Sequence, residues 1–182
     1  MGRVEIRIAG FGGQGIVLSG QIIGQAASIY DNKFATFTQS YGPESRGGSC
    51  TAEVVTSDEP IGYPYVLNPQ VLIILSQEAY AKYGRNHAPE TLVIIDSDLV
   101  KPTPSHNGAL LSIPATRMAR EMGRAVVANI IMLGLLAALS DAVSTEALRK
   151  SILASVPAGT AEFNIKAFEF GYKYGLEHKN RS

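Results

Sequence analysis

The first part of the chain shows a strand pattern that passes into a helix pattern. In residues 4–8, apolar side chains alternate with Glu5 and Arg7, which is the period of two expected for a strand. Residues 10–15, Gly-Phe-Gly-Gly-Gln-Gly, follow at once, and apolar side chains then recur at helical spacing over residues 16–30. A strand, a glycine loop and a helix in this order predict the opening of a βαβ unit.

Further strands and helices are predicted along the rest of the chain. Residues 34–38 and 50–56 are expected strands, with a turn-rich segment at 40–48 between them. Residues 71–75 and 92–95 are continuous apolar runs, as a strand buried on both faces needs. The other expected elements are a strand near 110–113 and helices at about 77–83, 115–122, 128–140, 145–154 and 161–174. The prediction is a single α/β domain over residues 1–182, Rossmann-like, with a mostly parallel sheet flanked by helices.

The composition narrows the classes of function. The chain has 182 residues, and its 16 Lys and Arg balance 16 Asp and Glu, so the formal net charge is zero. A neutral total gives no long-range attraction to nucleic acid or to anionic membranes, and neither is predicted as a partner. Charged residues make up only 18% of the chain, below the roughly 25% of ordinary domains. We therefore expect part of the surface to be buried against partner subunits.

Cysteine and histidine usage argues against metal chemistry in this chain. Cys50 is the only cysteine, which excludes an intrachain disulfide and indicates a reducing compartment. One thiolate is also too few for an iron–sulfur cluster. His87, His106 and His178 are scattered without ligand spacing, so no metal site is predicted. No signal-peptide pattern and no membrane span is recognised, and a cytoplasmic location is predicted.

The glycine loop is the first candidate binding site. Such a turn exposes backbone N–H groups at the positive end of a helix dipole, which suits a phosphate or another anion. The alternative is a tight turn that serves only helix–sheet packing. Ile16 and Val17 stand where a P-loop needs Lys and Ser or Thr, and no carboxylate follows Thr38 to hold an NAD ribose, so both classes are disfavoured. The candidate residues are Gly10, Gly12, Gly13, Gln14 and Gly15.

The turn-rich loop at residues 40–48 is the second candidate site. Arg46 beside two glycines offers charged donors next to accessible backbone amides, which suits a phosphate or a carboxylate. The alternative is a surface turn in which Glu44 and Arg46 pair or are solvated. If the strands at 4–8 and 34–38 are parallel neighbours, both loops converge at one sheet edge. The candidate residues are Tyr41, Gly42, Glu44, Arg46, Gly47 and Gly48.

Catalytic constellations have little support in the sequence. There is no Gly-x-Ser-x-Gly elbow and no paired-carboxylate spacing. Cys50 is interpreted as a small buried strand residue, and Asp96 and Asp98 as caps of the turn after a strand. Asn129, a polar residue at the start of an apolar helix, has two interpretations: it caps the helix or bonds backbone in the core, or it faces the ligand cleft or a partner subunit.

The two loops together resemble the gamma subunit of the 2-oxoacid:ferredoxin oxidoreductases. Residues 10–15 and 40–48 match its motifs at the right separation, as do residues 57–61 and 75–79 and the helix that begins at Asn129. The resemblance covers about residues 3–175. It implies membership of complexes that oxidatively decarboxylate a 2-oxoacid, transfer the acyl group to coenzyme A and pass two electrons to ferredoxin.

The same resemblance implies how the cofactors and partners are divided. Thiamine diphosphate and the iron–sulfur clusters would belong to other subunits, namely the thiamine-binding alpha and beta subunits and, where present, a ferredoxin-like delta subunit. This chain would contribute no catalytic residue and would handle coenzyme A, whose phosphates suit the helix start after Gly15 and the guanidinium of Arg46. Isolated from its partners, an apolar docking face favours self-association into a homo-oligomer.

Details of the loops indicate the branch of the family. Phe11 and residues 45–48 look most like the 2-oxoglutarate branch, whereas the pyruvate branch more often has Arg at the position of Phe11. Three alternatives stay open at this point. They are a pyruvate, 2-oxoisovalerate or indolepyruvate enzyme, a purely structural interaction subunit, and a stand-alone nucleotide- or NAD-binding module.

Overall fold

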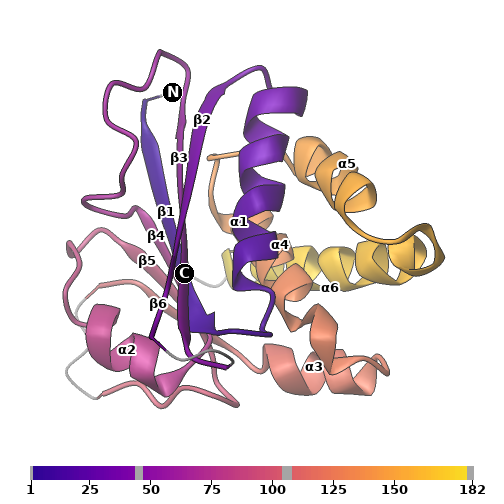
Figure 1. Cartoon of the computed structure of the whole chain (residues 1–182). Helices are drawn as coiled ribbons and strands as arrows, with labels where there is room; N and C mark the ends of the chain where they lie inside the picture. Colours follow the sequence, from indigo (N-terminus) through magenta and orange to yellow (C-terminus); the bar gives the residue numbers. More distant parts are fainter. Residues whose placement is uncertain (1, 44–46, 104–107, 180–182) are drawn as a thin grey trace.

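One six-stranded sheet organises the protein. The computed structural model describes residues 2–43, 47–103 and 108–179. The spatial order of the strands is β2-β3-β1-β4-β5-β6 (Figure 1). They are β1 (Val4–Phe11), β2 (Phe34–Tyr41), β3 (Ser49–Ser57), β4 (Val71–Ile74), β5 (Leu92–Asp96) and β6 (Leu110–Ile113). Every strand predicted from the sequence is present, and β2 continues three residues further than expected because its whole length pairs with β3.

One strand of the sheet runs against the others. β1, β4, β5 and β6 pair in parallel, whereas β3 is antiparallel to both of its neighbours, β1 and β2. β1 and β2 therefore run in the same direction but are separated by β3, so the expectation that they are direct neighbours is wrong. The loops still converge, because β3 begins where β1 and β2 end. Cys50 accordingly lies opposite Gly10 on one side and Tyr41 on the other.

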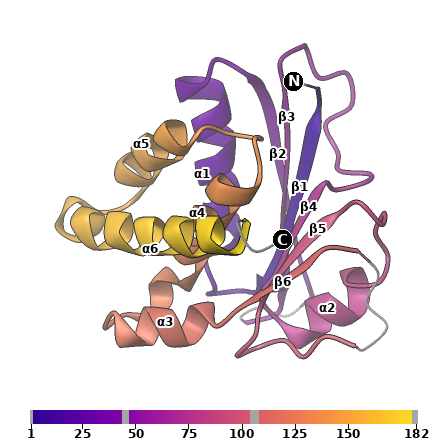
Figure 2. The ribbon, with the colours of Figure 1, turned by 180° about the vertical axis from the view of Figure 1, so that it is seen from behind.

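Helices cover the two faces of the sheet unequally. α2 lies alone on one face, and the other α-helices gather on the opposite face (Figures 1 and 2). The α-helices are α1 (Ile16–Gln25), α2 (Gln77–Tyr83), α3 (Ala115–Glu121), α4 (Ala128–Leu139), α5 (Thr145–Ser155) and α6 (Ala161–Lys179). Short helical segments are the π-helical η1 (Ala26–Tyr30) and the 3-10 turns η2 (Ala125–Val127) and η3 (Ala158–Thr160). The predicted class, a single Rossmann-like α/β domain with a mostly parallel sheet, is confirmed.

Two apolar cores explain the continuous apolar runs. On β4, Ile73 packs into the large core beneath α1, α4 and α6, whereas Leu72 and Ile74 face the small core beneath α2. All three side chains are at most 1% exposed. A strand covered on both faces needs apolar residues at every position, which is why residues 71–75 lack the alternation seen in β1.

Two helices end differently from the sequence prediction. The helix expected over residues 16–30 changes at Ala26 into η1, where the Asp31 N–H donates to the Ala26 carbonyl five residues back (3.1 Å). α6 continues to Lys179, five residues beyond the expected end.

Within the ranges that the structure describes, no helix combines the length and apolar character that a bilayer crossing requires.

Candidate functional site

The glycine loop lies where the chain changes direction across the sheet. β1 is followed by α1 on one face, whereas the neighbouring β4 is followed by α2 on the other face (Figure 1). The crevice at the carboxyl ends of two such strands is where open α/β sheets bind ligands. The fold therefore places the first candidate site at a position suited to a small molecule.

Gln14 fastens this loop across the crevice. Its side-chain N–H donates to the Leu75 carbonyl (2.7 Å), and its side-chain oxygen accepts the Phe11 N–H (2.6 Å). The amide thus joins the end of β1 to the end of β4. Both of its polar atoms are already engaged within the chain, so Gln14 shapes the loop that a ligand would meet.

The two predicted loops are in direct contact. The Gly12 N–H donates to the Gly48 carbonyl (2.9 Å), and the Gly42 N–H donates to the Ser49 carbonyl (2.7 Å). Gly13 and Gly47 both have positive φ, and a Cβ atom at either would meet no atom of the described residues within 4 Å, which leaves these backbones accessible on that side. Glu44 and Arg46 were also predicted for this site; they lie outside the described residues.

Glycines in the loop serve packing as well as access. Gly10 is enclosed, because a Cβ atom there would lie 2.9 Å from Ile16 Cδ1 and 3.1 Å from Leu75 Cβ. Gly15, with a φ of 74°, is the N-cap of α1, and no side chain in the described part of the chain caps this helix end. The first amides of a helix have no partner inside the helix, so α1 directs its positive dipole end at the loop.

Asn129 supports the loop from the core side. Its side chain is 3% exposed, and Nδ2 donates to the Gly15 carbonyl and to Ser19 Oγ, both at 3.3 Å. The side chain therefore ties the start of α4 to the start of α1. Of the two interpretations open from the sequence, these contacts correspond to bonding within the core, and a role for Asn129 in ligand binding stays a prediction.

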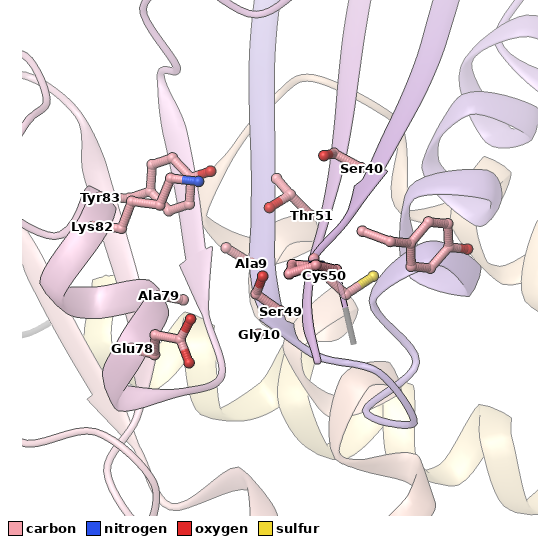
Figure 3. Close-up of a pocket in the computed structure, with 13 residues that line it drawn as sticks. Ala9, Gly10, Ser40, Ser49, Cys50, Thr51, Glu78, Ala79, Lys82 and Tyr83 are labelled. Carbon is pink, nitrogen blue, oxygen red and sulfur yellow. The ribbon is translucent and has the colours of Figure 1, made fainter. Parts of the chain in front are cut away.

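Two hollows flank the glycine loop. The hydroxyl hollow, of about 240 Å³, lies between α2 and the meeting ends of β1, β2 and β3 (Figure 3). Its lining includes Ser40, Ser49, Thr51, Glu78 and Lys82, together with the predicted Gly10, Tyr41 and Gly42. The apolar hollow, of about 220 Å³, lies on the other side and is lined by Gly13, Gln14, Leu75, Leu99, Thr116, Ala125, Val126 and Ala128. A ligand bound across the loop would meet polar groups on one side and apolar groups on the other.

Several residues of the hydroxyl hollow were not found by sequence reasoning. Ser40, Ser49 and Thr51 belong to two strands, and Glu78 and Lys82 come from α2, 27 or more residues further on. No motif joins them, because only the pairing of β2, β3 and β1 brings them together. An available signal was the (i, i+4) spacing of Glu78 and Lys82, which places both on one side of a helix.

Cys50 and Asp96 have structural roles near the site. Cys50 is 3% exposed, and burial raises the pKa of its thiol, so the protonated form dominates at neutral pH. Asp96 accepts hydrogen bonds from the Thr116 hydroxyl (2.6 Å), the Thr116 N–H (2.9 Å) and the Asp98 N–H (3.0 Å). Asp98 accepts the Arg117 N–H (2.8 Å). Asp96 therefore caps the turn after β5 as predicted, whereas Asp98 caps the first turn of α3.

Comparison with known proteins places this chain in a family. A family model described as pyruvate ferredoxin/flavodoxin oxidoreductase matches residues 5–174. The chain belongs to this family. A relative from Methanocaldococcus jannaschii, named 2-oxoglutarate synthase subunit KorC, is 51% identical over 178 residues, which are 96% of this chain and 95% of that protein. The oxidoreductase assignment and the resemblance to a gamma subunit are confirmed.

Two solved structures of oxoacid ferredoxin oxidoreductases share the fold. The gamma subunit of a keto/oxoacid ferredoxin oxidoreductase from Geobacter sulfurreducens superposes with a TM-score of 0.88 at 42% identity, covering 97% of this chain and 98% of that one. The 2-oxoglutarate:ferredoxin oxidoreductase from Magnetococcus marinus, solved with 2-oxoglutarate, coenzyme A and succinyl-CoA, superposes at 0.86 with 24% identity, covering 96% of this chain and 31% of that one. The second likeness concerns the fold alone, which there makes up part of a longer chain.

Proposed function

We propose that this chain is the gamma subunit of a thiamine-diphosphate-dependent 2-oxoglutarate:ferredoxin oxidoreductase. In that reaction 2-oxoglutarate loses CO₂, its remaining acyl group forms the thioester succinyl-CoA, and the two electrons released reduce ferredoxin. The observation that carries the proposal is the 51% identity, over nearly the full length of both chains, to a 2-oxoglutarate synthase subunit. Phe11 in the glycine loop favours the same branch.

Within the complex, we propose that this chain binds coenzyme A and contributes no catalytic residue. The uncapped start of α1, with Gly13 open beside it, suits the pyrophosphate of coenzyme A, because backbone amides and the helix dipole both favour an anion. Arg46 would add a charged donor from the second loop. The candidate binding set is the one proposed from the sequence, in which Gln14 and Asn129 act by holding the loop.

Thiamine diphosphate and the iron–sulfur clusters are assigned to partner subunits. A single cysteine cannot supply the ligands of a cluster. The proposed partners are the thiamine-binding alpha and beta subunits and a ferredoxin-like delta subunit, with ferredoxin as the acceptor of the complex. The low charge of the chain is in keeping with surfaces buried against such subunits. The cytoplasmic location stays a prediction.

Reconstitution tests this function directly. The thiamine-binding subunits are assayed with and without this chain for coenzyme-A-dependent reduction of a ferredoxin acceptor, using 2-oxoglutarate, pyruvate, 2-oxoisovalerate and indolepyruvate in parallel. Activity that requires this chain and favours 2-oxoglutarate is the expected result. A preference for another oxoacid would mean that the chain belongs to the branch that uses that oxoacid. If adding the chain changes the activity with none of the oxoacids, the proposal is refuted.

The role of Arg46 is tested in the same complex. Arg46→Ala removes one charged donor to a phosphate, so we expect the apparent KM for coenzyme A to rise about tenfold with little change in kcat. Arg149→Ala is the matched control, because Arg149 lies on α5 and pairs with Glu169 (2.6 Å). An unchanged KM in the Arg46 variant would remove this residue from the coenzyme A site.

A further inference from the structure

The hydroxyl hollow has a row of small and hydroxylated side chains as its floor. Ala9 of β1 lies opposite Thr51 of β3, which lies opposite Ser40 of β2, so these three side chains share one face of the sheet. Ser49 lies two residues from Thr51 and faces the same way. Figure 3 shows the hydroxyl groups of Ser40 and Thr51 directed toward α2. Ala9 and Ala79 are small, which leaves the space between sheet and helix empty.

The wall of the hollow that α2 forms carries a negative and a positive side chain that do not form an ion pair with each other. Glu78 and Lys82 are one helical turn apart on α2, and both line the hollow. Pairs with the same spacing elsewhere do form, at 3.6 Å for Glu146 with Lys150 and 2.7 Å for Glu162 with Lys166. Among the described residues, neither Glu78 nor Lys82 has an ion-pair partner; the Lys82 ammonium instead lies 5.0 Å from the ring centroid of Tyr83.

Neighbouring charges of the hollow are already neutralised. The Arg7 guanidinium donates to Glu53 (2.7 Å) and lies 4.9 Å from the Tyr83 ring centroid, so this pair is satisfied beside the hollow. Among the described residues, the charges offered to a ligand are therefore one carboxylate and one ammonium, about 5–6 Å apart at their Cβ atoms by helix geometry. A ligand that matches them needs a hydroxyl donor near one end and an anion near the other.

We infer that the hydroxyl hollow binds a ribose that carries a phosphate group. Glu78 accepts a hydrogen bond from a ribose hydroxyl, as acidic residues do in nucleotide sites. Lys82 faces the phosphate, and the hydroxyls of Ser40, Ser49 and Thr51 donate to its oxygens. Gly10 lines the same hollow, so the ligand would continue from the ribose toward the glycine loop.

This inference rests on the proposed function, because in the proposed complex coenzyme A supplies the phosphorylated ribose. Its 3′-phosphate would lie at Lys82 and its pyrophosphate at the start of α1. The carboxylate that a nucleotide site needs is absent after Thr38, and Glu78 of α2 supplies it from a different element. Chain order alone could not show this substitution.

Binding of adenosine 3′,5′-bisphosphate to the full chain tests the inference, with inorganic phosphate as a second probe. Amide shifts of the ¹⁵N-labelled protein are expected at Ser40, Thr51 and Lys82, with an affinity about tenfold higher for the bisphosphate than for phosphate. Lys82→Met is expected to weaken the bisphosphate about tenfold. Glu78→Gln is expected to weaken the bisphosphate about fivefold and to leave phosphate binding equal or stronger.

Lys173→Met is the matched control, because Lys173 is an exposed lysine of α6 and its loss removes the same charge. Shifts confined to other residues, equal affinities for both probes, or a Lys82 variant that binds like the Lys173 variant would each overturn the inference. Reconstitution separates the two proposals. If the bisphosphate binds in a Lys82-dependent way but the complex shows no coenzyme-A-dependent activity, the inference about the hollow stands and the proposed function is refuted. If the complex is active but the bisphosphate does not bind in this way, the proposed function stands and the inference about the hollow is refuted.

Discussion

At the scale of single residues, Gly15 decides the shape of the glycine loop for two independent reasons. Its φ of 74° lies in the left-handed region, which L side chains rarely adopt. A Cβ atom there would also collide with the side chain of Asn129, the residue that ties α4 to the loop. Backbone strain and side-chain contact therefore both select glycine at this position.

Gly15→Ala is expected to lower the free energy of unfolding by about 1–3 kcal/mol, which chemical denaturation measures. Gly159→Ala is the control, since a Cβ atom at Gly159 meets nothing within 4 Å and its φ is not positive; its effect should stay within about 0.5 kcal/mol. In an Asn129→Ala background, the same Gly15→Ala change should cost less than in the wild-type chain, because the collision is absent there. An equal cost in both backgrounds would mean that backbone strain alone selects this glycine.

At the scale of elements, helices α4 and α6 pack against each other at glycine positions. A Cβ atom on Gly171 of α6 would fall on the Ile131 carbonyl of α4, and one on Gly134 of α4 would fall on the Phe168 carbonyl of α6. The two backbones are thus in direct contact, as small residues permit. This crossing holds α4, and with it Asn129, at the height where it meets the start of α1.

Gly171→Ala is expected to destabilise the protein by about 3 kcal/mol, because neither backbone can yield without moving its helix. Gly24→Ala is the opposite control: a Cβ atom there would lie 3.8 Å from Phe37 Cβ, in ordinary contact, so the better helix propensity of alanine should raise stability by up to about 1 kcal/mol. Thermal and chemical denaturation of both variants give the sign of each change. Equal effects would show that propensity, and not the crossing, dominates at Gly171.

At the scale of the whole molecule, one edge of the sheet is unprotected. β2 is an edge strand of eight residues, FATFTQSY, without a charge or a proline, and Phe34 and Tyr41 are 47% and 61% exposed. Natural proteins shield such edges with charges, prolines or short strands, and β6 at the other edge has only four residues. An edge of this kind favours pairing with another strand.

The isolated chain is expected to self-associate with rising concentration through β2. Thr38→Lys should weaken this association at least about tenfold, since two lysines would meet across paired edges. Glu53 lies opposite Thr38 on β3, so the lysine has a compatible neighbour in the folded chain. Light scattering across a concentration series measures the effect, with Ala154→Lys on the exposed side of α5 as control. A wild-type chain that stays monomeric throughout would contradict the prediction.

Local pattern was sufficient for the elements and the loops. The period of two in β1, the continuous apolar runs of β4 and β5, and the helical spacing of α1 each depend on residues close in the chain, and all were predicted near their observed bounds. The helix after Ile16 was expected as one piece, but its last turn is π-helical, because Asp31 bonds to Ala26. Such a change depends on hydrogen bonds between residues five positions apart, which the spacing of apolar side chains does not encode.

By itself the sequence determined the fold class, the two glycine-rich loops and the family, because each depends on residue types at fixed separations along the chain. Only the tertiary structure decided that β3 lies between β1 and β2, that Asn129 holds Gly15, and that Glu78 and Lys82 face the hydroxyls of Ser40 and Thr51. These relations join residues up to 114 positions apart. Their physical basis is strand pairing and helix packing across the whole domain, which a local pattern of apolar and polar residues does not specify.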